Sequence, residues 1–130
     1  MTSRRNHEST HTQNPAMLLA GARPDVLVWR QQSGLFFTRD GNPVRCGLPG
    51  MADAGMIVSV RITPAMVGQV IGVACQPEFK TAVGRQSEAQ RCWQRAVEQR
   101  GGVYRLVRSA DDMRQLIQEV QDGTALCPLR

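Results

Sequence analysis

The chain has 130 residues, of which 42% are hydrophobic and 21% are charged. That length supports one hydrophobic core, and the composition is typical of a globular protein, which excludes the disordered and fibrous classes. No apolar run is long enough to cross a bilayer, and the polar first fifteen residues lack the apolar segment of a secretory signal. We therefore expect a cytoplasmic protein without a membrane partner.

The charge of the chain favours a polyanionic partner. The formal net charge is +5, and the 16 basic residues are 15 arginines and a single lysine, Lys80. Nucleic acid is the first candidate partner for such a basic chain. A lysine ammonium is compact and changes its pKa readily, whereas a guanidinium is a permanently charged fork. Lys80 therefore indicates a position that requires an ammonium.

The first part of the chain predicts a short helix followed by strands. Residues 1–7 are polar, and we expect a disordered tail there. A helix is expected over about residues 8–20, interrupted or kinked at Pro15. The β-rich stretch 25–29 predicts a strand. The apolar segments on either side of 40–43, which has the sequence DGNP, predict a hairpin.

The rest of the chain predicts further strands connected through helices. A glycine-rich loop, 47–55, leads to two expected strands, 56–62 and 69–81, and a later strand is expected over 103–107. Residues 123–130 have the composition of a loop-like tail. A strand that follows a crossover helix favours an α/β protein in which helices flank a mixed central sheet.

Two helices of the second half have clear start signals. Ser87 and Gln90 have the spacing of a capping box, and the glycine pair 101–102 marks the end of that helix. Ser109 precedes a last helix. Its expected apolar face consists of Met113, Leu116, Ile117 and Val120.

Two carboxylates and the lysine form a candidate catalytic group. Glu78 and Lys80 are two positions apart on an expected strand, so their side chains point to the same face. Asp53 precedes the expected strand 56–62 and can approach Glu78 if that strand neighbours 69–81. Oxygen ligands of this kind select Mg²⁺ or Mn²⁺, and a lysine beside them can serve an attacking water. The alternative is a surface Glu-Lys pair of at most about 1 kcal/mol.

The motifs of the chain resemble those of the VRR-NUC family, the virus-type replication-repair nucleases of the PD-(D/E)XK superfamily. The resemblance covers about residues 8 to 120. It is carried in order by RPDVLVWRQQSG, GLPGMAD, EFKTAVGRQSEAQRCWQ and GGVYRLVRS. The matching positions are Arg30, Ser33, Gly34, Asp53, Glu78, Lys80, Thr81, Gly84, Arg85, Ser87 and Gln90.

The resemblance implies a nuclease domain over 8–122 with a restriction-endonuclease-like core, in a bacterial or phage-infected cell. It implies a metal-dependent endonuclease that leaves 5′-phosphate and 3′-hydroxyl ends. The metal would be held by Asp53, Glu78 and the backbone carbonyl of Phe79. Lys80 would serve the water and Gln90 would steady the site. The helix-borne glutamate of this family would be Glu8.

The resemblance also implies the partners. Arg30, Ser33, Arg85 and Arg91 would contact DNA. Single-domain members look like Holliday-junction resolvases, so we expect branched or junction DNA as substrate and a homodimer. The two helix arginines have an alternative interpretation as a solvated helix edge. Gln90 also has an alternative interpretation, in which it only completes the capping box.

Two other function classes stay open. Pro77 occupies a position where the family has an aliphatic residue, and a proline withholds a ladder hydrogen bond, so it can displace Glu78. A non-catalytic DNA-binding module with the nuclease fold is therefore the first alternative. The second is a zinc hydrolase, because HESTH at 7–11 matches H-E-x-x-H. Dependence of activity on Mg²⁺, zinc or neither separates the three classes.

Overall fold

A computed structural model describes residues 9–126 of the chain. The chain divides into two compact units, residues 1–56 and 57–130, and each is described by itself. Together the described residues form a mixed α/β protein with three two-stranded ladders, β1-β4, β2-β3 and β5-β6. The helices and strands are therefore those of the expected class. The expected single mixed sheet is not observed, because the described strands form three separate hydrogen-bonded pairs.

The first unit begins with a helical segment. A π-helical turn, η1 (Ser9–Gln13), leads into α2 (Asn14–Gly21), and Pro15 lies in the first turn of α2. A proline is tolerated there because the amide N–H groups of the first turn have no helical acceptor. The expected helix is confirmed over its described part. Pro15 lies at the start of the α-helix rather than at a kink within it.

The hairpin of the first unit is confirmed. Strand β2 (Gly34–Phe37) pairs antiparallel with β3 (Pro43–Cys46), and Phe37 lies opposite Pro43. The turn between them is closed by a hydrogen bond of 2.9 Å from the Thr38 amide to the Asn42 carbonyl. Gly41 in this turn has a φ of +84°, a conformation that glycine adopts without strain.

Strand β1 (Val26–Arg30) pairs with β4 (Ala54–Val58). The close approach of the two strands requires a glycine at position 55, since a Cβ there would lie 2.5 Å from the ring of Trp29. The expected strand 56–62 was wrong in its bounds. The ladder starts two residues earlier and ends at Val58, because the pairing partner β1 has only five residues.

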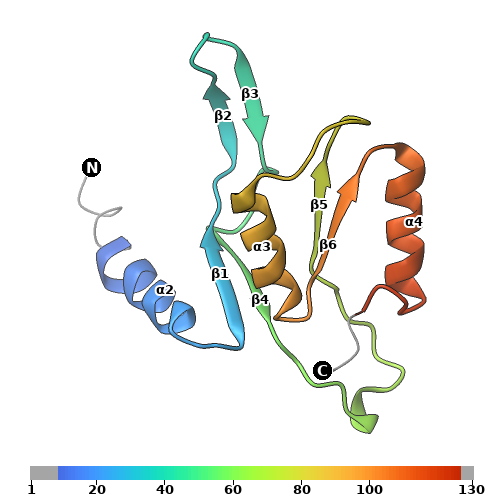
Figure 1. The fold of residues 1–130 in the computed structure, drawn as a ribbon. Coiled ribbons are helices and arrows are strands. Elements are labelled where there is room, and N and C mark those ends of the chain that lie inside the picture. The colour runs from blue at the N-terminus through green and yellow to red at the C-terminus, as the bar shows by residue number, and fades with distance from the viewer. Residues whose placement is uncertain (1–8, 127–130) are drawn as a thin grey trace. The chain divides into compact units, whose positions relative to one another are not determined.

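The second unit is built around a parallel strand pair. Strand β5 (Cys75–Phe79) pairs in parallel with β6 (Val103–Val107), and α3 (Glu88–Glu98) connects them. Figure 1 shows α3 on one side of this pair and α4 (Ala110–Gln121) on the other. The strand over 103–107 is confirmed. Helices therefore flank a sheet in this unit, although that sheet has two strands.

The expected long strand 69–81 was wrong. Only its last part, β5, belongs to a ladder, and the chain before it contains the short 3-10 helix η2 (Pro64–Met66). Of the apolar residues between these elements, Val67, Val70 and Ile71 are exposed, Val70 completely, whereas Val73 packs against the core. A strand extends only as far as a partner supplies hydrogen bonds.

The start signals of both helices are confirmed. The Ser87 hydroxyl accepts the amide of Gln90, and the Gln90 side chain accepts the amide of Ser87, so the capping box is complete. The Ser109 hydroxyl accepts the amide of Asp112 at the start of α4. These contacts satisfy amide groups that a helix leaves without acceptors.

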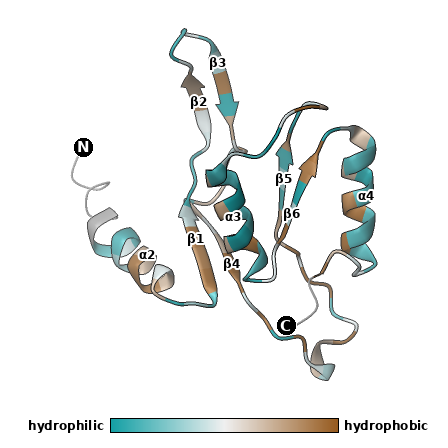
Figure 2. Cartoon of the chain, viewed as in Figure 1, coloured by the Kyte–Doolittle hydropathy of each residue, from teal (hydrophilic) through white to brown (hydrophobic). Residues whose placement is uncertain are grey.

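The two faces of the β5-β6 pair differ in character. On the α4 face, Val103, Val107 and Leu116 form the buried core, and Met113 and Val120 pack against it. Ile117, which we expected in the apolar face of α4, is instead 52% exposed. On the other side, α3 is mostly hydrophilic along its length (Figure 2), although its Val97 is completely buried. None of the helices in the described part of the chain is both long and apolar enough to span a bilayer.

Candidate active site at the carboxyl end of strand β5

Glu78 and Lys80 meet as the sequence spacing predicts. Lys80 Nζ lies 3.5 Å from Glu78 Oε1, and the two side chains are 18% and 30% exposed, respectively. The register places Glu78 opposite Leu106 of β6, on the face that α3 covers. A carboxylate and an ammonium are thus held together at the carboxyl end of a parallel strand pair. Ligands of α/β proteins commonly bind at this end of a sheet.

Gln90 is a second partner of Glu78. Its Nε2 atom donates a hydrogen bond of 2.6 Å to Glu78 Oε1, the same oxygen that faces Lys80. Its Oε1 atom accepts the amide of Ser87 at 2.9 Å. The capping interpretation and the contact with Glu78 are therefore both realised by one side chain. The catalytic role of Gln90 stays a prediction.

The backbone around Lys80 is anchored on both sides. The Lys80 amide donates to the Val107 carbonyl at 3.1 Å, which extends the ladder by one residue beyond β5. The Thr81 hydroxyl accepts the amide of Gly84 at 3.1 Å, and the Arg108 guanidinium donates to the Thr81 carbonyl. These bonds fix the turn that follows Lys80, so the ammonium projects from a constrained position.

Pro77 does not interrupt the ladder that holds Glu78. The Ala74 carbonyl and the Lys80 amide both bond to β6, so the even-numbered residues of β5 face that strand. Along a parallel strand, the backbone N–H and C=O groups of successive residues point alternately to one neighbouring strand and to the opposite edge. The position of the missing N–H of Pro77 is therefore on the opposite edge of β5. A proline at this position is compatible with an undisplaced Glu78.

The same alternation places the Phe79 carbonyl on the edge away from β6. This oxygen is not used by the β5-β6 ladder, and the contacts of the Glu78 carboxylate with Gln90 and Lys80 both go to its Oε1 atom. Glu78 Oε2 and the Phe79 carbonyl are hard oxygen donors of the type that Mg²⁺ and Mn²⁺ prefer. The donor chemistry of this end of β5 therefore fits the implied metal.

Of the other implied metal ligands, Asp53 belongs to the first unit and Glu8 is not among the described residues. Asp53 is exposed, directly precedes β4 and accepts the Gln31 amide on its backbone carbonyl at 3.0 Å. The expected pairing of the strand after Asp53 with the strand of Glu78 is not observed, because β4 pairs with β1. Within residues 9–126 no three His, Cys, Asp or Glu side chains cluster as metal ligands.

Only one histidine of the zinc motif lies in the described part of the chain. His7 and Glu8 are outside it, and His11 is an exposed residue of η1. The zinc interpretation therefore stays a prediction from the sequence.

The predicted DNA-binding residues lie in both units. In the first unit, Arg30 ends β1 and donates to Asn14 Oδ1 at 2.5 Å, and Ser33 packs against Gly47. In the second unit, Arg85 is exposed in the loop before α3. Arg91 is held on the helix surface by Glu88 Oε2 at 2.8 Å, and this guanidinium lowers the pKa of the Glu88 carboxyl. That contact favours the helix-edge interpretation of Arg91.

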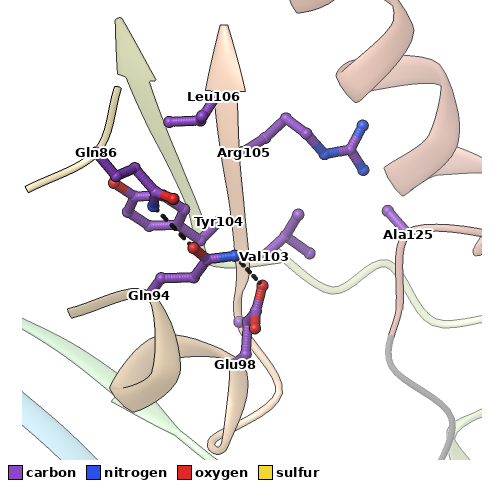
Figure 3. A pocket seen from close by; sticks show the side chains of 9 residues that line it. Gln86, Gln94, Glu98, Val103, Tyr104, Arg105, Leu106 and Ala125 are labelled. Carbon is purple, nitrogen blue, oxygen red and sulfur yellow. Dashed lines mark hydrogen bonds between the residues drawn. The ribbon is translucent and has the colours of Figure 1, made fainter. Parts of the chain in front are cut away.

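A row of polar contacts along α3 was missed by sequence reasoning. Trp93 Nε1 donates to Gln76 Oε1 at 3.3 Å. Gln86 Nε2 donates to Gln94 Oε1 at 2.8 Å, and Gln94 Nε2 donates to Glu98 Oε1 at 3.0 Å (Figure 3). The signal was the spacing of four residues between positions 90, 94 and 98, which places polar side chains on one stripe of α3, with Gln86 in the loop just before the helix.

This row borders a hollow of about 380 Å³ at β6, to which Gln86, Gln94 and Tyr104 contribute (Figure 3). Tyr104 is 6% exposed, and in the described part of the chain its buried hydroxyl has no hydrogen-bond partner. A buried hydroxyl without a partner is unfavourable. The polar row of α3 therefore leaves one polar group of this face unsatisfied.

Comparison of the chain with protein-family models, with curated proteins and with solved structures gave no match.

Proposed function

We propose that the chain is a divalent-metal-dependent nuclease that hydrolyses phosphodiester bonds of DNA. The observation that carries this proposal is the shared carboxylate oxygen of Glu78, which Lys80 Nζ approaches at 3.5 Å and Gln90 Nε2 at 2.6 Å. Four features support the proposal: the parallel strand end, the single lysine, the net charge of +5 and the motif resemblance.

The roles follow from the chemistry of each side chain. Glu78 and the Phe79 carbonyl would hold Mg²⁺ or Mn²⁺. A bound divalent cation supplies a lowered water pKa and stabilises phosphate charge. The Lys80 ammonium can orient an attacking water and stabilise negative charge on the scissile phosphate. Gln90 fixes the orientation of the Glu78 carboxylate from a capped helix start.

The finer parts of the proposal rest on the resemblance. We infer that β5, α3 and β6 belong to a restriction-endonuclease-like core, and that Asp53 and Glu8 are further metal ligands. In-line attack by water would leave 5′-phosphate and 3′-hydroxyl ends. The proposed substrates are branched or junction DNA, and the proposed assembly is a homodimer.

Cleavage of labelled DNA tests the proposal. Purified protein is incubated with duplex, nicked, flap and four-way-junction DNA in EDTA, Mg²⁺ or Mn²⁺. We expect cleavage with Mg²⁺ or Mn²⁺ only, and loss of at least about 100-fold in rate in Lys80→Ala, as for other groups that stabilise charge in a transition state. Arg114→Ala is the matched control, because Arg114 is an exposed cation on α4 whose ion pair among the described residues is with the exposed Asp111.

The outcomes separate the classes. Tight binding of DNA without cleavage under any metal would reject the nuclease and favour the binding module. Hydrolysis of peptides that is restored by Zn²⁺ after chelation would favour the zinc hydrolase. Equal cleavage by the Lys80→Ala and wild-type proteins would assign the activity to another site or to a contaminant.

A further inference from the structure

A hollow of about 360 Å³ lies where β5 and β6 end and α4 begins. Its lining combines an aromatic ring, two cations and an apolar floor. The lining residues are Phe79, Lys80, Val107, Arg108, Ser109, Ala110 and Met113. All of them belong to the second unit. The hollow therefore adjoins the candidate active site through the consecutive residues Glu78, Phe79 and Lys80.

Phe79 is the exposed wall of this hollow. Its side chain is 68% exposed, whereas Val107, its ladder partner on the same face of the sheet, is 4% exposed. An aromatic ring so exposed at a strand end contributes little to the core. The Phe79 ring is thus largely accessible beside a floor made by Val107 and the half-buried Met113.

Arg108 supplies the charge of the hollow. Its backbone amide is held by Asp112 Oδ2 at 2.8 Å, and its Nη1 atom donates to the Thr81 carbonyl. A guanidinium has five N–H donors, so this contact leaves donors for a further acceptor. The side chain is exposed, yet its position is fixed at both ends.

The start of α4 is a poorer place for a phosphate. Its Ser109 hydroxyl already accepts the Asp112 amide, and its first turn carries the carboxylates of Asp111 and Asp112. These negative charges oppose an anion at the helix start. A phosphate beside the hollow would therefore contact Arg108 rather than the amides of α4.

We propose that Phe79 stacks an unpaired nucleobase of the DNA substrate while Arg108 contacts a phosphate of the same strand. This inference rests on the proposed nuclease function and names its substrate class, DNA with an unpaired nucleotide beside the scissile bond. Base stacking on an aromatic ring is tolerant of sequence. A base within a duplex is covered on both faces by its neighbours and cannot stack on Phe79.

The placement of the two sites supports this reading. Glu78 and Phe79 are consecutive strand residues, so their side chains point to opposite faces of β5. A DNA strand that crosses the end of β5 would place a phosphate on the side of Glu78 and Lys80 and a base on the side of Phe79. The net charge of +5 favours such a polyanionic strand over an apolar peptide.

Binding in EDTA tests the inference without turnover. Single-stranded oligonucleotides that carry 2-aminopurine are titrated with wild-type protein, Phe79→Leu and Phe79→Tyr. Stacking quenches 2-aminopurine fluorescence. We expect about 10-fold weaker binding and loss of quenching in Phe79→Leu, and retention of both in Phe79→Tyr. Val83→Ser is the matched control, because Val83 is an apolar residue in the loop after β5 that is even more exposed, at 87%.

Arg108 has a separate readout. Arg108→Gln should reduce the slope of log affinity against log salt by about 0.7, the value for one phosphate contact to a single strand. Circular dichroism of each variant checks that the fold is retained.

Several results would overturn the inference. One is equal quenching by the wild-type protein and Phe79→Leu, and another is equal affinity for blunt duplex and single strand. A third is unchanged DNA binding with a lower dimer fraction in Phe79→Leu, which would assign the surface to a protein contact. Because no metal is present, absence of cleavage leaves this test intact. Cleavage that is independent of Phe79 would reject the stacking site alone.

Discussion

Gln90 and Glu78 are joined by a hydrogen bond of 2.6 Å from Gln90 Nε2 to Glu78 Oε1. The oxygen of the same carboxamide, Gln90 Oε1, accepts a hydrogen bond of 2.9 Å from the Ser87 amide. One side chain therefore couples the start of α3 to the carboxylate at the end of β5. An amide is suited to this position because it is a donor and an acceptor at once.

Replacement of Gln90 by glutamate should separate these two functions. Glutamate retains the capping box but places a second carboxylate against Glu78, and two adjacent carboxylates resist joint ionisation. We expect Gln90→Glu to keep the free energy of unfolding at neutral pH within about 1 kcal/mol of the wild-type value and to lose at least about 10-fold in cleavage rate. Urea denaturation and initial cleavage rates measure the two effects.

Ser87→Ala is the matched control for the capping contact. It removes the hydroxyl that accepts the Gln90 amide and should lower the free energy of unfolding by about 1 kcal/mol. The cleavage rate at a temperature where the protein is folded should change little. If Ser87→Ala and Gln90→Glu lowered cleavage equally, the contact between Gln90 and Glu78 would have no role beyond holding the helix.

The sequence predicted the elements whose signals are local. The capping box at Ser87, the cap at Ser109 and the DGNP turn each lie within a few residues, and the structure contains all three. The meeting of Glu78 with Lys80 was also predictable, because a strand places residues two apart on one face. Each of these features depends on spacing alone.

Other features depend on which segments become neighbours. The contact of Arg108 with the Thr81 carbonyl spans 27 positions, and that of Trp93 with Gln76 spans 17. The first exists because β6 returns beside β5, and the second joins α3 to β5; no local pattern encodes either neighbour. The strand 69–81 was predicted too long for the same reason, since its apolar first half has no partner strand in the described part of the chain.

The hydroxyl of Tyr104 should be dispensable for stability. It is buried without a hydrogen-bond partner in the described part of the chain, so the folded state gains nothing from it and loses its hydration. We expect Tyr104→Phe to leave the free energy of unfolding unchanged or to raise it by up to about 1 kcal/mol. Tyr104→Ala should lower it by about 3–5 kcal/mol through loss of ring packing.

Urea denaturation of the wild type and both variants measures these changes. A loss of more than about 1 kcal/mol in Tyr104→Phe would contradict the prediction and would show that the hydroxyl has a partner, such as ordered water.

Gly102 and Val97 should show coupled effects on stability. A Cβ at position 102 would lie 2.7 Å from Val97 Cγ1, and Val97 is completely buried. We expect Gly102→Ala to cost about 1–3 kcal/mol through overpacking and Val97→Ala to cost about 2 kcal/mol through a cavity. Because the smaller side chain at position 97 makes room for the new methyl group, the double variant should lose less than the sum of the two.

A double-mutant cycle by chemical denaturation measures the coupling. Additive losses would place the strain of Gly102→Ala at Ile57 Cδ1 or the Val97 carbonyl, each of which lies 3.2 Å from the same Cβ position and is unchanged in Val97→Ala.

The ion pair between Arg105 and Glu119 should make stability depend on acid pH. Arg105 Nη2 lies 2.7 Å from Glu119 Oε2, and hydrogen bonds from Arg105 and then Gln115 lower the pKa of the Glu119 carboxyl below its ordinary value of 4.5. The unfolded chain therefore binds this proton at a higher pH than the folded chain does, so stability rises with pH through this range. The contribution is fully present above about pH 4.5 and is lost as the pH falls through the lower folded pKa.

Glu119→Gln removes the titrating group and keeps its size, so thermal denaturation from pH 6 to pH 3 should show a smaller loss of stability in acid than in the wild type. Parallel pH profiles of the two proteins would mean that Arg105 stabilises the charged form no better in the folded state than water does in the unfolded one.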